Sequence, residues 1–280
     1  MILIDMNQIA VANLMMNLKM NNSKTIDESM VRHMILNSIR MYRMEHHDEY
    51  GEVVLTWDSK HSWRRDYFPE YKASRRKGRE ESDLDWDDIF GTLNKIRNEI
   101  KQNFPYKYLE VFGAEADDII GFLCEENRDQ KIMIISGDKD FIQLQKYPNV
   151  RQWSPITKKD VNGFDPTTYL KEHILRGDTS DGVPNVLSPD NTFTDGLRQR
   201  PLSRKKIQSW LIGGGSDWND EVKRNFQRNS TLIDLSRTPE ELKNQIRLEY
   251  NNAPHGDRSK LLNYFMQNKL KELTENIGEF

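Results

Sequence analysis

The sequence contains a single cysteine, Cys124, among its 280 residues. One cysteine cannot form an internal disulfide or a zinc site of the CxxC type, so a reducing compartment is favoured. The six histidines show no HExxH spacing, which argues against that class of zinc hydrolase. No apolar run approaches the roughly 20 residues needed to cross a bilayer. The first residues also lack the features of a signal peptide, and we expect a cytoplasmic protein.

An excess of charge of one sign is lacking as well. The chain has 41 basic and 44 acidic residues, for a net charge of −3. This balance neither supports nor excludes nucleic acid binding, because the distribution of charge decides. The mean hydropathy of −0.82 indicates a polar surface, and 36% hydrophobic residues suffice for a core. The length fits one large domain, or a domain with a smaller addition.

Short apolar segments alternate with helical ones in the first half of the chain. Segments 2–5, 52–58 and 131–136 predict buried strands, and a capping box of Thr25 and Glu28 predicts the start of a helix. This alternation predicts a mostly parallel α/β sheet flanked by helices. After residue 163 strand signals become rare, and a last helix is predicted over 259–277. We therefore expect an α/β domain over 1–163, which includes a basic segment over 61–88, and a smaller helical domain over 164–280.

Carboxylates gather where the predicted strands end. Ligands of open parallel sheets bind beyond the carboxyl ends of the strands, so these side chains should converge. Each acid alone is more often a turn residue or a helix cap, and one of Asp117 and Asp118 could serve only as a cap. Several groups at one edge favour a shared site. The candidate ligands are Asp5, Asp58, Glu115, Asp117, Asp118, Asp138, Asp140, Asp178 and Asp181.

Carboxylates at this density repel one another unless a cation lies among them. Mg²⁺ prefers oxygen ligands and often bridges carboxylates to substrate phosphate. Two ions about 4 Å apart can activate water and stabilise both oxygens of an in-line displacement. Because no Ser/His or Cys/His nucleophile pair is visible, we expect metal-activated water to attack. The expected cofactor is a pair of Mg²⁺ ions, with Mn²⁺ able to substitute.

The basic segment interleaves cations with aromatic residues. Between residues 63 and 80, seven cations face only Asp66, Glu70 and Glu80. Cations neutralise phosphates and aromatic rings stack unpaired bases, whereas the alternative is a solvated charged helix. The residues of this segment that we expect to contact nucleic acid are Arg64, Arg65, Tyr71, Arg76, Lys77 and Arg79. A second basic group, which includes Lys205 and Lys206, could hold duplex further away.

Several segments resemble the flap endonuclease, or 5′-nuclease, family, in particular its members from T-even bacteriophages. They are LIDMNQIA, SMVRHMILNSI, WRRDY, EADD, DKDFIQLQKYPNVRQWSP and the closing LTENIGEF. The resemblance runs over nearly the whole chain and is strongest from Asp5 to about residue 160. PEYKASR also resembles the 5′-nuclease domains of bacterial DNA polymerase I.

The resemblance implies a 5′ nuclease that removes RNA primers and adjoining DNA from lagging-strand fragments and cuts 5′ flaps and forks. It implies a first metal among Asp58, Glu115, Asp117, Asp118 and Asp138, and a second among Asp5, Asp140, Asp178 and Asp181. By resemblance, Lys72 and Arg75 contact the scissile phosphate, and Tyr71 helps to orient the unpaired strand. The implied substrates are branched or nicked DNA and RNA–DNA hybrid with a 5′ end. A single-stranded-DNA-binding protein is an implied partner, and the implied location is the cytoplasm of the infected host cell.

Two departures from the family pattern change these expectations. The first strand begins at residue 2, so we do not expect a sliding-clamp-binding peptide before it. GDTSDGVPN continues into SPDNTFTDGLRQRP instead of a glycine-rich helix–turn–helix, which predicts an irregular duplex grip and leaves the presence of a potassium site open. We expect a monomer.

Three other functions share part of this pattern. A PIN-type ribonuclease shares the sheet and has fewer acids, but the Asp178/Asp181 pair and the basic segment argue against it. A haloacid-dehalogenase-like phosphatase needs a second acid after the first strand, where this chain has Asn7. A non-catalytic binder of branched DNA would not need the acids, all of which are present.

Overall fold

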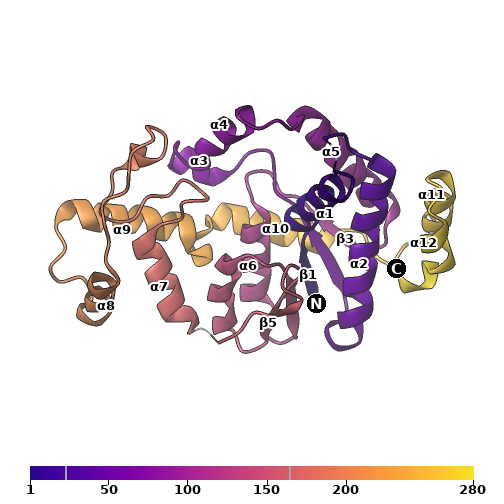
Figure 1. Ribbon diagram of the computed structural model, residues 1–280. Helices are drawn as coiled ribbons and strands as arrows, with labels where there is room; N and C mark the ends of the chain where they lie inside the picture. The colour runs from indigo at the N-terminus through magenta and orange to yellow at the C-terminus, as the bar shows by residue number, and fades with distance from the viewer. Residues whose placement is uncertain (23, 164) are drawn as a thin grey trace.

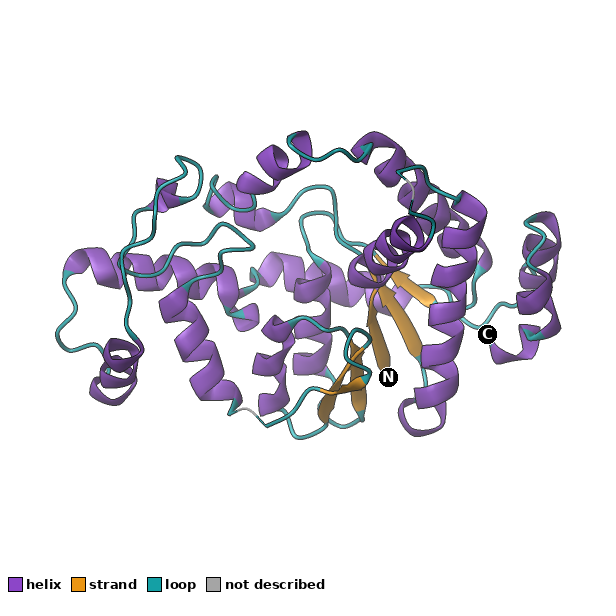
Figure 2. Ribbon diagram, viewed as in Figure 1, coloured by secondary structure: helices purple, strands orange, loops and turns teal. Residues whose placement is uncertain are grey.

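A six-stranded sheet forms the centre of the protein in the computed structural model (Figure 1, Figure 2). The structure describes residues 1–22, 24–163 and 165–280, without the side chain of Lys77. The strand order is β3-β2-β1-β4-β5-β6, parallel except for the last pair. The strands are β1 (Ile2–Asp5), β2 (Val53–Thr56), β3 (Lys107–Leu109), β4 (Ile132–Ile135), β5 (Val150–Ser154) and β6 (Lys159–Asp160). The prediction of a mostly parallel α/β sheet is confirmed, and β3, β5 and β6 are strands that it missed.

Helices flank the sheet and continue into a lobe beside it (Figure 2). The α-helices are α1 (Met6–Met20), α2 (Glu28–Tyr50), α3 (Trp63–Tyr67), α4 (Ser74–Glu80), α5 (Trp86–Asn103), α6 (Ala116–Glu126), α7 (Pro166–Arg176), α8 (Arg204–Gly213), α9 (Asp220–Ile233), α10 (Glu240–Asn252), α11 (Leu261–Gln267) and α12 (Lys271–Glu275). The 3-10 turns are η1 (Lys139–Lys146), η2 (Asp190–Thr192), η3 (Leu235–Arg237) and η4 (Ile277–Glu279). No helix in the described part of the chain has the length and apolar character required to cross a bilayer.

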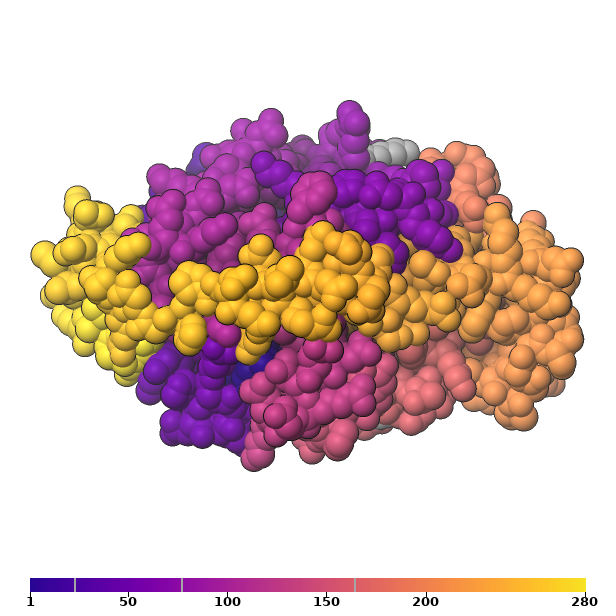
Figure 3. Space-filling view, turned by 180° about the vertical axis from the view of Figure 1, so that it is seen from behind, coloured from indigo at the N-terminus to yellow at the C-terminus, as the bar shows by residue number. Residues whose placement is uncertain are grey.

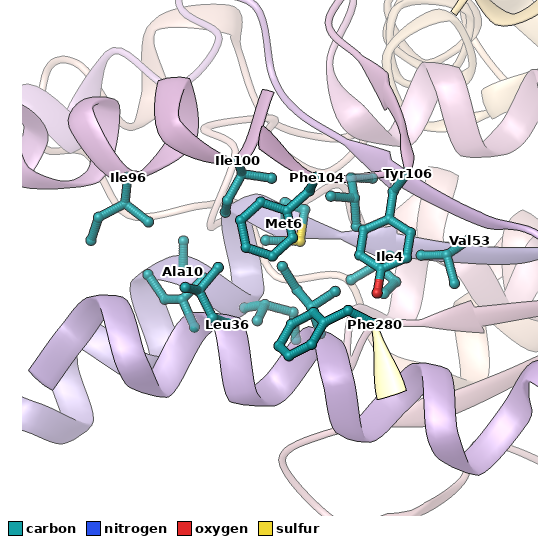
Figure 4. Packing of buried hydrophobic residues seen from close by; sticks show 14 of the residues in the cluster. Ile4, Met6, Ala10, Leu36, Val53, Ile96, Ile100, Phe104, Tyr106 and Phe280 are labelled. Carbon is teal, nitrogen blue, oxygen red and sulfur yellow. The ribbon is translucent and has the colours of Figure 1, made fainter. Parts of the chain in front are cut away.

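The central strands are apolar on both faces, which is typical of parallel strands covered by helices. Alternate residues of β1 enter different cores: Ile2 and Ile4 pack with α1, α2 and α5, whereas Leu3 packs with α6 and α10. The first core is closed by rings from the end of α5 and from the C-terminus, with Phe104 stacked edge-on against Phe280 (Figure 4). This burial fixes β1 and therefore the position of Asp5 at its end.

Residues 165–280 pack in separate places. Helices α7 to α9 form a lobe with two small cores, one of its own and one that it shares with Phe68 and Tyr71 of the basic segment. In contrast, α10 packs on the second sheet core, while α11, α12 and Phe280 pack on the first. Figure 3 shows this C-terminal chain as a continuous band across the back of the molecule.

Two local predictions were wrong. The helix expected over 259–277 is divided into α11 and α12, because Lys269 adopts a left-handed conformation with φ of 55° between them. Helix α2 is capped by Asp27 and not, as predicted, by Thr25: the Asp27 side chain accepts a hydrogen bond from the Met30 amide. Aspartate and threonine are both good N-caps, so sequence preference alone could not decide between positions two residues apart.

Candidate active site

A pocket of about 180 Å³ lies beyond the carboxyl ends of β1, β2 and β4. Strand order reverses between β1 and β4, and ligands of open sheets bind at such switch points. Lys72 and Arg75, from the basic segment above the sheet, also line the pocket (Figure 1). The structure brings together seven of the nine predicted carboxylates here: Asp5, Asp58, Asp117, Asp138, Asp140, Asp178 and Asp181.

Local hydrogen bonds hold the strand-end carboxylates in place. Asp5 caps α1, accepting from the Gln8 amide at 3.1 Å, and also accepts from the Ser136 hydroxyl at 3.0 Å. Asp58 accepts from the Ala116 amide at the start of α6, at 2.8 Å. Asp138 caps η1 by accepting from the Asp140 amide at 2.9 Å. The acids therefore do serve as caps, and the same hydrogen bonds fix them around one pocket.

Burial and mutual repulsion disfavour the ionised forms of this group. Burial, together with the carboxylates of Asp138 and Asp5, raises the pKa of Asp117 well above its usual range. Burial, with added repulsion from Asp58 and Asp138, raises the pKa of Asp5 to about 7. The charges that disfavour ionisation of Asp5 are those of Asp58 and Asp138, whereas the resemblance places Asp5 with the second group; which cation Asp5 would bind stays a prediction. An oxygen-only donor set that resists ionisation without a counter-cation fits a hard divalent ion.

The second group surrounds a residue that sequence reasoning missed. The imidazole of His173, in the last turn of α7, lies between two carboxylates: Nδ1 is 3.2 Å from Asp140 and Nε2 is 3.4 Å from Asp178. Burial raises the pKa of Asp140 to about 7 even though His173 lowers it. Burial opposes ionisation of Asp178 too, but hydrogen bonds from His173 and Ser180 hold its pKa below the usual range. No spacing pattern in the sequence links His173 with Asp140, 33 residues away.

Lys72 reaches the pocket through an unusual backbone conformation. Its φ is 56°, and its amide donates to the Asp181 carbonyl at 2.7 Å. A Cβ at Gly182, whose φ is 73°, would lie 3.0 Å from the Glu70 carbonyl oxygen, so the two segments are in close contact. The Lys72 ammonium donates to Glu115 at 2.5 Å and lies 3.6 Å from Asp181. Glu115 therefore stands behind Lys72 and does not line the pocket, and its part in binding a cation stays a prediction.

Arg75 and Asp181 complete the contact between the basic segment and the acids. The Arg75 guanidinium donates to Asp181 Oδ1 at 2.5 Å and to the Ser180 carbonyl at 3.1 Å. The Arg75 side chain remains 46% exposed, so it can also meet a ligand from outside.

Three predicted roles need correction. Asp118 is fully buried outside the pocket, and its oxygens accept from Arg64, Trp63 and Thr238, so it is a structural residue and not one that faces a metal ion in the pocket. Arg64 is only 2% exposed and is held by Asp118 and by the Leu232 carbonyl, which removes it from any nucleic acid interface. Tyr71 is 3% exposed and its hydroxyl lies 2.7 Å from a carboxylate oxygen of Glu115 and 2.7 Å from one of Asp181, so its ring is not available to a base.

The remaining predicted nucleic acid contacts lie on the surface, and their role stays a prediction. Arg65 is exposed, Arg76 is exposed and pairs with Glu80, and Arg79 lies over the Phe90 ring. Lys205 and Lys206 lie on α8, at the end of the molecule far from the sheet (Figure 1). The side chain of Lys77 lies outside the described residues.

Carboxylates at the edge of a parallel sheet, faced by cations from a covering segment, define a metal-dependent phosphodiester hydrolase. Residues 1–173 match the family model of the N-terminal, resolvase-like domain of 5′-3′ exonucleases, and residues 166–280 match that of the T4 RNase H C-terminal region. The chain belongs to the 5′-3′ exonuclease family, and its resemblance to the T-even phage RNase H branch is confirmed. It is therefore a nuclease, and its pocket of carboxylates fits a divalent metal ion.

Individual relatives agree with this assignment. Ribonuclease H of Enterobacteria phage T4 is 36% identical over 99% of this chain and 95% of its own length. A 5′-3′ exonuclease of Buchnera aphidicola is 30% identical over 71% of this chain and 72% of its own. The fold is similar to that of the bacteriophage T5 flap endonuclease in complex with DNA and metal ions, with a TM-score of 0.61 and 17% identity over 89% of this chain and 97% of that one.

Proposed function

We propose that this chain uses two Mg²⁺ ions to remove RNA primers and adjoining DNA from lagging-strand fragments and to cut 5′ flaps and forks. The observation that carries the proposal is the pocket itself, in which seven carboxylates meet Lys72 and Arg75. The named activities of the T4 relative and of the flap endonuclease relatives support the same substrates. Mn²⁺ is expected to substitute for Mg²⁺, since both accept oxygen ligands.

The carboxylates divide into two sets that would each hold one cation. Asp58, Asp117 and Asp138, with Asp5, would hold the first, while Asp140, Asp178 and Asp181 would hold the second. Bound there, the ions would supply an activated water and neutralise charge on the reacting phosphate.

The protein's own residues bind and orient the substrate. Lys72 and Arg75 line the same pocket as the strand-end acids and would hold the scissile phosphate by charge and hydrogen bonds. The Lys72 ammonium donates to Glu115, and the Arg75 guanidinium donates to Asp181. These two acids therefore position Lys72 and Arg75 before the substrate binds. Arg65, Arg76 and Arg79 would contact the unpaired 5′ strand, because they extend the same segment along the surface.

Duplex binding is assigned to the lobe of α7 to α9. Lys205 and Lys206 are exposed on α8 and would contact backbone phosphates of the duplex. The chain from Pro184 to Pro201 is mostly irregular, which suits the expected departure from a regular helix–turn–helix grip. A phage single-stranded-DNA-binding protein is the proposed partner, in the cytoplasm of the infected host, and the enzyme is proposed to act as a monomer.

The proposal is tested with a 5′-labelled flap and a 5′-labelled RNA–DNA hybrid, each with and without Mg²⁺. Asp138→Asn should abolish cutting but retain binding of the flap, because it removes a cation ligand and no phosphate contact. Asp160→Asn, at an exposed acid of β6, is the matched control and should cut normally. Cutting without a divalent cation, or full activity of Asp138→Asn, would contradict the mechanism.

A further inference from the structure

His173 occupies a position that the proposed mechanism does not use. It lies in the last turn of α7, while its two contacts come from different parts of the chain: Asp140 from η1 and Asp178 from the turn after α7. Its side chain is 16% exposed, and each contacted carboxylate side chain is 18% exposed. The imidazole thus joins the α/β part of the chain to the neighbouring lobe at the second cation position.

The bridge uses both ring nitrogens. Nδ1 faces Asp140 Oδ1 at 3.2 Å and Nε2 faces Asp178 Oδ2 at 3.4 Å. Tyr169, one turn earlier on α7, contacts the ring edge-on with centroids 6.0 Å apart. An imidazole with a neighbour on each nitrogen and a ring against its side has little rotational freedom, so the separation of the two carboxylates is set by the rigid ring.

The other contacts of these carboxylates are local. Asp178 accepts from the amide and hydroxyl of Ser180 and from the amide of Asp181, all within its own turn. The backbone around it is tightly determined, because a Cβ at Gly177 would lie 2.3 Å from the Val183 carbonyl oxygen. The turn that contains Asp178 is therefore rigid in itself. His173 contacts both Asp178 and Asp140, and it fixes the position of the turn relative to Asp140.

We infer that His173 is a positioning residue which holds Asp140 and Asp178 at the separation required for binding the second divalent cation, without ligating that cation itself. The inference rests on the proposed two-cation function. It follows that the first set of carboxylates, around Asp117, should bind a cation independently of His173. The role requires a hydrogen-bond donor between the carboxylates, so a lysine ammonium at this position should replace the imidazole in part. A ligand role could not be replaced in this way, because a charged ammonium has no lone pair for a metal.

The test measures Mn²⁺ binding to the full chain, without nucleic acid, by electron paramagnetic resonance titration. His173→Ala should weaken the second binding step by roughly 10- to 100-fold, the usual effect of losing a group that orients a metal ligand. The first step should be unchanged, and His173→Lys should recover part of the lost affinity. His33→Ala removes another partly buried histidine that faces a carboxylate, Glu272 at 3.5 Å, and should leave both steps unchanged.

A second readout separates positioning from ligation. Pulsed electron paramagnetic resonance of the wild-type protein with Mn²⁺ at both sites should show no ¹⁴N coupling of the strength of a bound imidazole. Such a coupling would overturn the inference, as would an unchanged second step in His173→Ala or no recovery in His173→Lys. Flap cutting by the wild-type protein is measured in parallel: its absence would contradict the proposed function, whereas cutting combined with an unaltered His173→Ala titration would contradict only this inference. Thermal unfolding of each variant confirms that the titrated protein is folded.

Discussion

Arg64 lies in the basic segment, but the structure makes it a core residue, and Arg64→Met separates the two interpretations. Its guanidinium donates to Asp118 at 2.8 and 2.9 Å, to Glu115 at 3.1 Å and to the Leu232 carbonyl at 2.8 Å. Methionine keeps most of the apolar stem but leaves Asp118 charged, fully buried and without its cation. Removing one partner of a buried pair costs about 3–5 kcal/mol of stability.

The assay is thermal and denaturant unfolding of Arg64→Met beside Arg65→Met, its exposed neighbour. At about 2 °C per kcal/mol, the lower end for large domains, Arg64→Met should unfold roughly 6–10 °C below the wild type. Arg65→Met should change stability by less than about 0.5 kcal/mol, as surface substitutions do. DNA affinity, measured where both variants are folded, should fall for Arg65→Met and stay unchanged for Arg64→Met. A stable Arg64→Met variant that binds flap DNA weakly would refute the reasoning.

Three further predictions follow from the same contacts. Lys72→Ala should lower kcat by about 10²–10³-fold with little change in KM, because it removes a donor aimed at developing charge; an unchanged kcat in single-turnover assays would remove Lys72 from the mechanism. The pKa values of Asp5 and Asp140 are raised to about 7, against 3.8 for an ordinary aspartate. Between pH 3.8 and about 7, the metal-free native state therefore binds more protons than the unfolded state. The free energy of unfolding of metal-free protein should therefore fall as pH rises from about 4 to 7, and Mg²⁺ should restore it at pH 7.5; a rise over this interval that Asp5→Asn leaves unaltered would contradict the prediction. Phe280→Ala should cost about 3–5 kcal/mol in denaturant unfolding, since the ring is 1% exposed, whereas Leu262→Ala on the exposed side of α11 is the control and should cost little.

The sequence predicted the strand-end acids correctly because the rule behind them is simple. Asp5, Asp58 and Asp138 each follow an apolar run, and parallel strands bring their carboxyl ends to one edge. Three strands toward the two sides of the sheet were not predicted: β3 has three residues, β6 has two, and β5 alternates buried with more exposed positions and contains Arg151 and Gln152. Such strands are recognised from their pairing partners, which only the folded chain supplies.

The electrostatic roles within the site depended on contacts between distant residues. Arg64 and Asp118 are 54 positions apart, and neither has a local feature that distinguishes a buried ion pair from a surface cation and a ligand. His173 likewise meets Asp140 only because α7 packs against η1. The return of α10 to α12 to the sheet has the same origin, since helical periodicity shows an apolar stripe but not the surface that it covers.

The central claim is that one pocket holds two cations, and anomalous diffraction from crystals grown with Mn²⁺ tests it most directly. Two anomalous peaks should appear about 3.5–4 Å apart. One should lie beside Asp117 and Asp138, and the other beside Asp140, Asp178 and Asp181. A single peak, or peaks outside this pocket, would contradict the claim.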